Sequence, residues 1–388
     1  MNKETHYLKH KNIKVASLYI DGGEVYDVQV FEKEHLPYLF EAENQKNIRL
    51  MNNWIANRGI PFSREDYDAI IEKYSVQSTK ELTILGMGLN LTDHYWIADV
   101  TYDKNWEDVN YFDNKFSSRI GELIPELAEK QNDFMNPDFS SNGHLQKIWI
   151  INGNTRCLLK AGSGDLKQEP YNETIASYIA GCLGIEHVEY SLAQHGDEIY
   201  SICPCMVNRD NEFINSFVVY LHGGKSNDKY HTYVNICETN GIKNAKTDID
   251  KMIVLDYLIR NTDRNAGNFG ILRNAQTLQW EKVAPVFDNG NSLWYNSQII
   301  HNIGMGTKSE CRSFTGENEK NMGLIGDISW FDKNKLNTAG NEIRRILKTN
   351  TIMENERIEK IASSFMDRVQ KIDMHLTQKP KIAKRLKR

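Results

Sequence analysis

The sequence has 388 residues, 40% of them hydrophobic and 26% charged, and its formal net charge is -5. This length exceeds what one hydrophobic core usually supports, so we expect two or three packed units. No apolar run reaches about 18 residues, and the chain begins with polar residues, which argues against a membrane span and against a secretory signal. We therefore expect a soluble, cytoplasmic protein with no membrane partner.

The charge and the cysteines exclude further classes. A negative net charge gives no overall attraction to nucleic acid, so such contacts are expected only indirectly or through the basic tail from Lys379 to Arg388. The 6 cysteines include no CxxC pair, which argues against a zinc site and against a disulfide framework. We interpret the only close pair, Cys203-Pro204-Cys205, as part of a buried strand.

Residues 1 to about 125 form the first block. A hairpin is predicted from Val15 to Ile20 and from Val25 to Phe31, because two apolar stretches flank a turn with two glycines. A helix is expected near Ile48 to Asn57. Aromatic residues from Thr92 to Phe116 indicate packing or a protein interface rather than catalysis.

The second block, about 126 to 208, is predicted to be a small antiparallel sheet with one helix. Strands are expected at Lys147 to Ile151 and at Arg156 to Lys160, because Asn152-Gly153-Asn154 favours a tight turn between them. The helix is expected at Glu169 to Leu183, where small and apolar residues recur on one face. Two further strands precede residue 208.

The third block, 209 to 388, is dominated by predicted helices at Asp248 to Asn261, Lys335 to Leu347 and Ile358 to Met374. A small antiparallel lobe with one helix, followed by a larger helical lobe, is an architecture with a cleft between its halves. Such clefts bind ligands.

Polar residues gather abruptly after the first of these helices, in the loop from Asn261 to Gly270. A hairpin is expected next, with strands at Phe269 to Arg273 and Leu278 to Phe287. The hairpin would bring Asp263, Asn268 and Asp288 to the same end of two neighbouring strands.

Phosphoryl transfer needs such a set: a carboxylate that accepts the proton of the attacking hydroxyl, and oxygen ligands that hold Mg²⁺ between phosphates. The step from Asp263 to Asn268 equals the D-x-x-x-x-N spacing of a kinase catalytic loop. The alternative is a turn whose Asp and Asn side chains merely satisfy backbone groups. We favour an ATP- and Mg²⁺-dependent phosphotransferase, with Asp263 as base and with Asn268 and Asp288 as metal ligands.

Lys160, at the end of a predicted strand, is the expected phosphate-contacting lysine. Glu173 on the next helix is its expected ion-pair partner, and Glu169 is the rival. Gly143 and Lys147 lie where a phosphate-covering loop is expected, since Gly143 permits close approach of the backbone and Lys147 adds charge.

The sequence resembles the HipA-like kinases, bacterial serine/threonine kinases that include toxins of toxin-antitoxin pairs, over about residues 130 to 330. The resemblance rests on the loop from Asp263 to Asn268, on Val286-Phe287-Asp288, and on Asn172-Glu173-Thr174-Ile175-Ala176 followed by Leu183-Gly184-Ile185. It implies an α+β, two-lobed protein-kinase-like fold, with an α/β N-terminal subdomain at 1–125, the small lobe at 126–208, and the helical lobe with its basic tail at 209–388.

The resemblance also implies site roles. Asp263 would be the catalytic base, Asn268 and Asp288 the magnesium ligands, and Lys160 the lysine that contacts the phosphates of ATP. Adenine would lie against the backbone at Cys205, Met206 and Val207. Members of the family can phosphorylate a serine in their own phosphate loop, which makes Ser140 and Ser141 candidates for autophosphorylation.

The sequence departs from the family pattern at one position of the catalytic loop. Family members often have histidine where this chain has Asn265, so a role for that imidazole is lost.

Three functional classes are considered for the chain. The favoured class is a protein serine/threonine kinase with a protein substrate, including a toxin with an antitoxin-like partner protein. The second is a nucleotide-binding pseudokinase or DNA-associated regulatory module. The third is a lipid or small-molecule kinase, because Asp263 to Asn268 also resembles the loop of phosphatidylinositol kinases.

Overall fold

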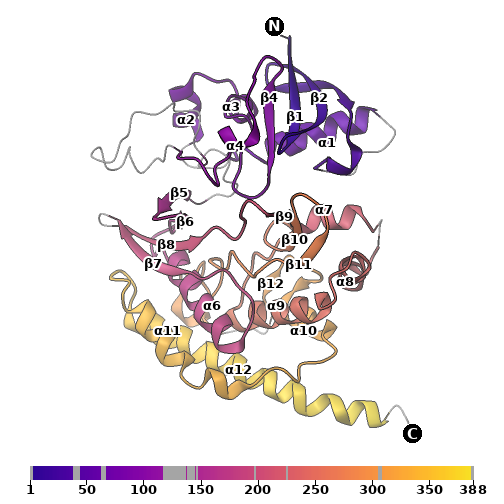
Figure 1. Cartoon of the computed structure of the whole chain (residues 1–388). Coiled ribbons are helices and arrows are strands. Elements are labelled where there is room, and N and C mark those ends of the chain that lie inside the picture. The colour runs from indigo at the N-terminus through magenta and orange to yellow at the C-terminus, as the bar shows by residue number, and fades with distance from the viewer. Residues whose placement is uncertain are drawn as a thin grey trace. The chain divides into compact units, whose positions relative to one another are not determined.

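The computed structural model describes residues 3–37, 44–62, 67–116, 137, 145, 147–195, 198–223, 226–304 and 308–385. Three residues of the predicted phosphate loop, Ser140, Ser141 and Gly143, lie outside the described residues. The chain divides into two compact units (Figure 1), unit 1 with residues 1–160, 204–213 and 273–279, and unit 2 with residues 161–203, 214–272 and 280–388. The division at residues 125 and 208 stays a prediction. Among the described residues, none of the helices has the length and apolar character that a bilayer crossing requires.

Unit 1 is built on an antiparallel sheet in the order β3-β2-β1-β4. Its strands are β1 (Lys3–His10), β2 (Ile13–Asp21), β3 (Glu24–Val30) and β4 (Tyr95–Asp99). The β2–β3 hairpin confirms the prediction, and its turn uses Gly22 and Gly23 at φ of 58° and 83°, where a side chain would be strained.

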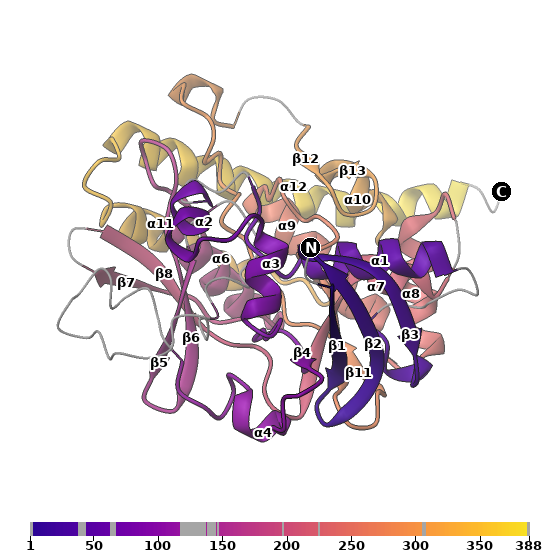
Figure 2. The same cartoon turned by 90° about the horizontal axis from the view of Figure 1, so that it is seen from above.

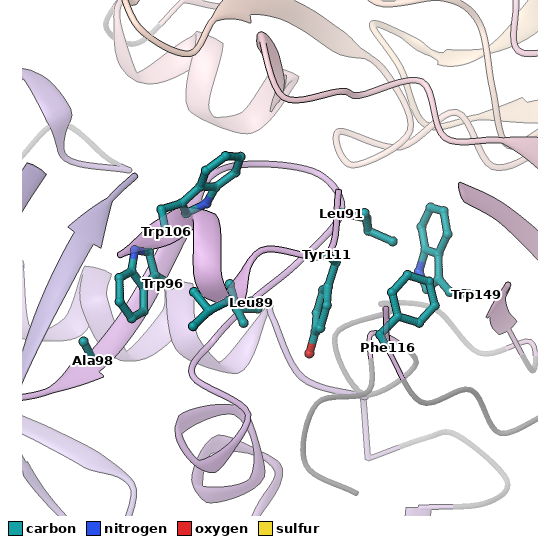
Figure 3. Packing of buried hydrophobic residues seen from close by; sticks show 9 residues of the cluster. Leu89, Leu91, Trp96, Ala98, Trp106, Tyr111, Phe116 and Trp149 are labelled. Atoms are coloured by element: carbon teal, nitrogen blue, oxygen red, sulfur yellow. The ribbon is translucent and has the colours of Figure 1, made fainter. Parts of the chain in front are cut away.

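Helices and an aromatic core complete this part of unit 1. The helices are η1 (Lys33–His35), α1 (Asn44–Ala56), α2 (Tyr67–Tyr74), α3 (Thr79–Leu85) and α4 (Trp106–Val109). Helix α1 packs against β3, where the Asn52 amide binds both the N–H and the C=O of Val25, at 2.9 and 2.8 Å. Figure 3 shows Trp96, Trp106, Tyr111 and Phe116 in one buried cluster. Of the two roles predicted for this aromatic segment, packing and a protein interface, the structure supports packing.

A second hairpin of unit 1 comprises β5 (Lys147–Asn152) and β6 (Thr155–Lys160). This confirms the predicted hairpin, whose turn holds Gly153 at φ of 62°. The register places Lys147 directly opposite Lys160.

Unit 2 is mainly helical. Its helices are α6 (Glu169–Leu183), α7 (Ser216–Leu221), α8 (Lys229–Thr239), α9 (Ala245–Ile259), η4 (Ile300–Asn302), α10 (Asn318–Leu324), η5 (Lys333–Leu336), α11 (Ala339–Leu347) and α12 (Asn355–Arg385). Helix α12 runs alongside α11 and α9 (Figure 2). Helix α6 has the bounds that the sequence predicted.

The remaining strands are short. They are β7 (Ser191–His195), β8 (Glu198–Pro204), β9 (Asn211–Asn215), β10 (Gly270–Asn274), β11 (Trp280–Val283), β12 (Glu310–Cys311) and β13 (Gly316–Glu317). Strands β7 and β8 form an antiparallel hairpin, as do β12 and β13. The mixed α+β class is confirmed.

The predicted strand from Leu278 to Phe287 was too long. Leu278 has φ of 59°, a left-handed conformation that a strand cannot contain, and β11 ends at Val283. Further on, Val286 forms a parallel bridge with His187 instead of continuing the hairpin. Asp288 therefore follows a separate extended segment that α6 and its following loop help to position.

Candidate active site

The polar loop after α9 begins with a buried asparagine. Helix α9 ends with Arg260 in the left-handed conformation at φ of 54°. Asn261 is buried, donates its amide N–H to Asp256 Oδ1 at 2.9 Å, and accepts the Asp263 N–H at 3.0 Å. The Asn318 amide donates to the Asn261 carbonyl at 2.8 Å. These bonds fix the path of the chain just before the predicted base.

Arg264 is the centre of this site. Its side chain is fully buried, and it forms a bidentate ion pair with Asp256 on α9, at 2.8 Å from Nη2 to Oδ1 and 3.0 Å from Nε to Oδ2. Burial lowers the pKa of Arg264, but the Asp256 carboxylate more than reverses that effect and the guanidinium stays charged.

The other N–H groups of Arg264 reach two further segments. Nη1 donates to the carbonyl of Asn268, at 2.9 Å, and to the carbonyl of Phe287, while Nη2 donates to Asn289 Oδ1 at 2.5 Å. Each of the five guanidinium N–H groups thus has an acceptor. One side chain therefore brings the backbone of Asn268 and the residue preceding Asp288 to the same point.

Asp263 is positioned by two amides and stays accessible. Asn265 donates to its Oδ1 at 3.2 Å, and Asn291 donates to its Oδ2 at 3.3 Å. Its side chain is 30% exposed, and the exposed Arg312 lies 3.6 Å from Oδ1. Amide donors orient a carboxylate and leave it able to accept a proton, so this geometry suits a general base.

Asn265, the position where the family often has histidine, contacts two parts of the loop. Besides donating to Asp263, its Oδ1 accepts the Gly267 N–H at 2.8 Å. The asparagine thus braces the loop from both sides, although it cannot carry the positive charge of a protonated histidine.

The predicted magnesium ligands have suitable donor groups. Asn268 donates its amide N–H to the Asp263 carbonyl at 2.7 Å, which directs the amide oxygen away from that carbonyl. Asp288 adopts the left-handed conformation at φ of 56°, which is uncommon for a residue other than glycine and marks a constrained position. Carboxylate and amide oxygens are ligands that Mg²⁺ accepts. The donor set therefore fits the ion.

Helix α6 anchors the segment that carries Asp288. The Asn172 amide donates to the carbonyls of Gly290 and Ser292, both at 2.8 Å. Glu173, which is 1% exposed, accepts the Asn289 N–H at 2.7 Å. Glu173 thus holds the residue after Asp288, a contact that the sequence did not predict, while its pairing with Lys160 in unit 1 stays a prediction.

Two other contacts, which the sequence did not predict, involve Glu169 and Asp288. Glu169, the rival partner of Lys160, accepts the backbone N–H of Ser163 at 3.0 Å and also its hydroxyl. The Tyr190 hydroxyl accepts the Asp288 N–H at 3.4 Å, and burial raises the pKa of Tyr190 well above its ordinary value, so the phenol stays protonated.

Unit 1 holds the remaining candidates. Lys147 and Lys160 are cross-strand partners, so their side chains project from the same face of the β5–β6 hairpin, and Lys160 is only 3% exposed. Cys205 donates its backbone N–H to the Arg156 carbonyl at 2.7 Å, and Val207 is buried nearby in sequence.

Sequence reasoning missed the supporting residues of the site. They are Asn172, Asp256, Asn291 and Arg312, together with the structural role of Arg264. A signal was present for one of them: Asp256 interrupts the apolar run Ile253-Val254-Leu255, and a carboxylate at such a position is rarely buried without a cationic partner.

Residues 139–371 match the model of the family described as HipA-like C-terminal domain. A curated relative, the serine/threonine-protein kinase CtkA of Helicobacter pylori, is 26% identical over 132 residues, which is 32% of this chain and 40% of the relative. The chain therefore aligns with less than half the length of that relative.

Two solved structures are similar. The crystal structure of the Helicobacter pylori proinflammatory kinase CtkA has a TM-score of 0.47 and 18% identity, and the match covers 61% of this chain and 95% of that one. The Shewanella oneidensis HipA, in a complex with HipB and operator DNA, has a TM-score of 0.51 and 12% identity, over 95% of this chain and 97% of that one. At these identities the second likeness concerns the fold alone, and the first supports no conclusion.

Proposed function

The chain belongs to the HipA-like C-terminal domain family, and from this premise we propose that it is an ATP- and Mg²⁺-dependent kinase acting on serine or threonine hydroxyls of proteins. The observation that carries the proposal is the cluster in unit 2 where Arg264 binds the carbonyls of Asn268 and Phe287, next to Asp263 and Asp288. One buried side chain thereby holds the backbone of Asn268 and of the residue before Asp288, the two proposed metal ligands, and the proposed base Asp263 directly precedes it in the chain. The kinase relative supports the same reaction class.

In this proposal Asp263 orients the substrate hydroxyl and accepts its proton. Asn268 and Asp288 hold Mg²⁺, which would neutralise charge on the phosphates of ATP. Asn265 and Asn291 keep the carboxylate of Asp263 in one orientation.

The nucleotide contacts belong to unit 1. Lys160 and Lys147 would contact the phosphates, and the backbone from Cys205 to Val207 would bind adenine. Gly143 would lie in the loop over the phosphates, where Ser140 and Ser141 are proposed targets of autophosphorylation.

The central test is incubation of the purified chain with Mg²⁺ and ATP labelled on its γ-phosphate, with and without cell extract. Transfer is expected to the chain itself or to extract proteins, and we expect Asp263→Ala and Asp288→Ala to abolish it. Asp367→Ala, an exposed position on α12, is the matched control and should transfer as wild type does. The proposal is contradicted if the wild-type protein transfers label neither to itself nor to any extract protein.

Two readouts separate the other classes. A nucleotide-dependent rise in melting temperature without transfer to any acceptor would indicate a pseudokinase. Phosphoamino-acid analysis and mass spectrometry of the labelled chain would show whether Ser140 or Ser141 is modified, and labelled lipid or small molecules without labelled protein would shift the substrate class.

An antitoxin-like protein partner is the second part of the proposal. It is supported by the similarity to a structure of HipA with HipB and operator DNA, which describes that protein and its partners. Induced expression of wild type and Asp263→Ala in a bacterial host tests the toxicity that such a partner would have to suppress. Growth arrest by wild type alone would favour a toxin, whereas equal growth of both strains would favour a kinase without toxicity.

A further inference from the structure

A buried cluster in unit 1 lies outside the site described above. His10 comes from β1, His94 immediately precedes β4, and Glu212 lies on β9. The three residues are 1%, 0% and 0% exposed. One ligand atom from each lies within 4.8 Å of the other two. The cluster therefore joins three strands that are distant in sequence.

The spacing of these atoms suits a metal ion. Glu212 Oε2 lies 3.1 Å from His10 Nε2 and 3.5 Å from His94 Nδ1. Around a tetrahedral zinc ion with nitrogen and oxygen ligands at about 2.0–2.1 Å, neighbouring ligand atoms are about 3.3–3.4 Å apart. The two distances lie on either side of that value.

The hydrogen bonds of His94 leave one nitrogen facing the cluster. Its Nε2 lies 2.9 Å from the Asn208 carbonyl, which can only accept, so Nε2 carries the proton. In a neutral imidazole, Nδ1 then carries no proton and offers a lone pair. This nitrogen is buried without a hydrogen-bond partner and faces the Glu212 carboxylate. Two acceptors facing each other away from water are unfavourable unless a cation lies between them.

Neighbouring side chains orient the other two residues of the cluster, His10 and Glu212. His10 Nδ1 lies 2.9 Å from His35 Nδ1, and His10 Nε2 is within hydrogen-bond distance of Glu212 Oε2, at 3.1 Å. The His94 backbone N–H also donates to Oε2, at 3.3 Å, so a bound ion would replace the His10 hydrogen bond and share Oε2 with that N–H. Glu212 Oε1 accepts from Arg273 Nε at 2.5 Å, so its other oxygen faces the histidines. Metal ligands in proteins are usually oriented by such partners.

We propose that unit 1 contains a structural zinc site with His10 Nε2, His94 Nδ1 and Glu212 Oε2 as protein ligands. Two histidines and a carboxylate are a ligand set that zinc accepts, with a water molecule completing the coordination. The ion would fasten β1, β4 and β9 together and would take no part in phosphoryl transfer. Cysteine spacing could not reveal this site, because none of its ligands is a thiol.

The test is a calorimetric titration of the chelator-treated, full-length protein with Zn²⁺, followed by thermal melts with Zn²⁺ and with chelator. We expect one zinc per chain and a melting temperature that rises with Zn²⁺. His94→Ala and Glu212→Gln should lose both effects, whereas His301→Ala, an exposed histidine on η4, should keep them. Substitution by Co²⁺ should give a spectrum without thiolate charge transfer.

Two further variants keep the test decisive if a ligand variant does not fold. His35→Ala retains all three ligands but loses the partner of His10, so its zinc affinity should fall about 10- to 100-fold. Asp288→Ala should bind zinc as wild type does, which separates this site from the magnesium ligands. The proposal is overturned if wild type binds no stoichiometric zinc or if His94→Ala binds zinc as wild type does. In the first case a proton on His94 would take the place of the ion.

Discussion

The Arg264 guanidinium and the Asp256 carboxylate form a buried, bidentate ion pair beneath the predicted catalytic loop. Removal of either partner would leave an uncompensated charge in the interior. We expect Arg264→Met and Asp256→Leu each to lower the free energy of unfolding by about 3–5 kcal/mol, and the double variant to lose less than their sum. Denaturant unfolding of the four proteins measures this, and strictly additive losses would show that the two charges are not coupled.

Asn265 should affect turnover more than folding. Asn265→Ala removes one hydrogen bond to Asp263 and one from Gly267. A hydrogen bond to a charged group contributes about 1.5–3 kcal/mol, so kcat should fall roughly 10- to 100-fold while the KM for ATP stays near its wild-type value. Asn265→His restores a donor to Asp263 and should recover most of the activity. A histidine variant no better than the alanine variant would contradict the bracing role.

Lys160 should govern nucleotide affinity. A hydrogen bond to a charged group contributes about 1.5–3 kcal/mol, so Lys160→Met should raise the Kd for ATP roughly 10- to 100-fold. The ATP-dependent rise in melting temperature should shrink accordingly. Lys371→Met, at an exposed position on α12, controls for loss of charge alone. Equal nucleotide affinity in Lys160→Met and wild type would remove this lysine from the site.

Buried thiols give a prediction on pH. Burial raises the pKa of Cys311 to about 11 and the pKa values of Cys205 and Cys237 to about 12. Because the thiolate is the reactive form, these cysteines should resist thiol reagents near neutral pH, and their rates should rise about tenfold per pH unit until they approach these values. Mass spectrometry after timed labelling checks this, with Cys182, which is partly exposed on α6, as the internal reference. Rapid labelling of Cys311 in the folded chain at pH 7 would contradict it.

The fold was most predictable where local patterns determine it. The β5–β6 hairpin follows from Asn152-Gly153-Asn154, and α6 follows from its apolar face, so both have bounds close to those expected. Strand β1 was missed because its charged residues and histidines hide the apolar alternation, although Leu8 and His10 are buried. Their burial depends on partners far along the chain, which a local pattern does not contain.

In the candidate site, too, local features were predictable from the sequence and long-range contacts were not. The spacing of Asp263 and Asn268 lies within one loop and was visible in the sequence. The contact of Glu173 with the Asn289 N–H was not, because it joins residues 116 apart through tertiary packing. Likewise, β11 begins only after the left-handed Leu278, and beyond its end at Val283 the chain bridges to His187 through Val286. Neither feature has a sequence signature.

The anchoring of the Asp288 segment by α6 has a consequence for inhibitor design. A compound that displaced this segment would have to break the bonds of Asn172 to the carbonyls of Gly290 and Ser292 and the bond of Glu173 to Asn289. Each bond of Asn172 contributes about 0.5–1.5 kcal/mol, and the one bond to the Glu173 carboxylate contributes more. Compounds that bind without moving this segment therefore avoid an energetic cost that compounds requiring it to swing outward would meet.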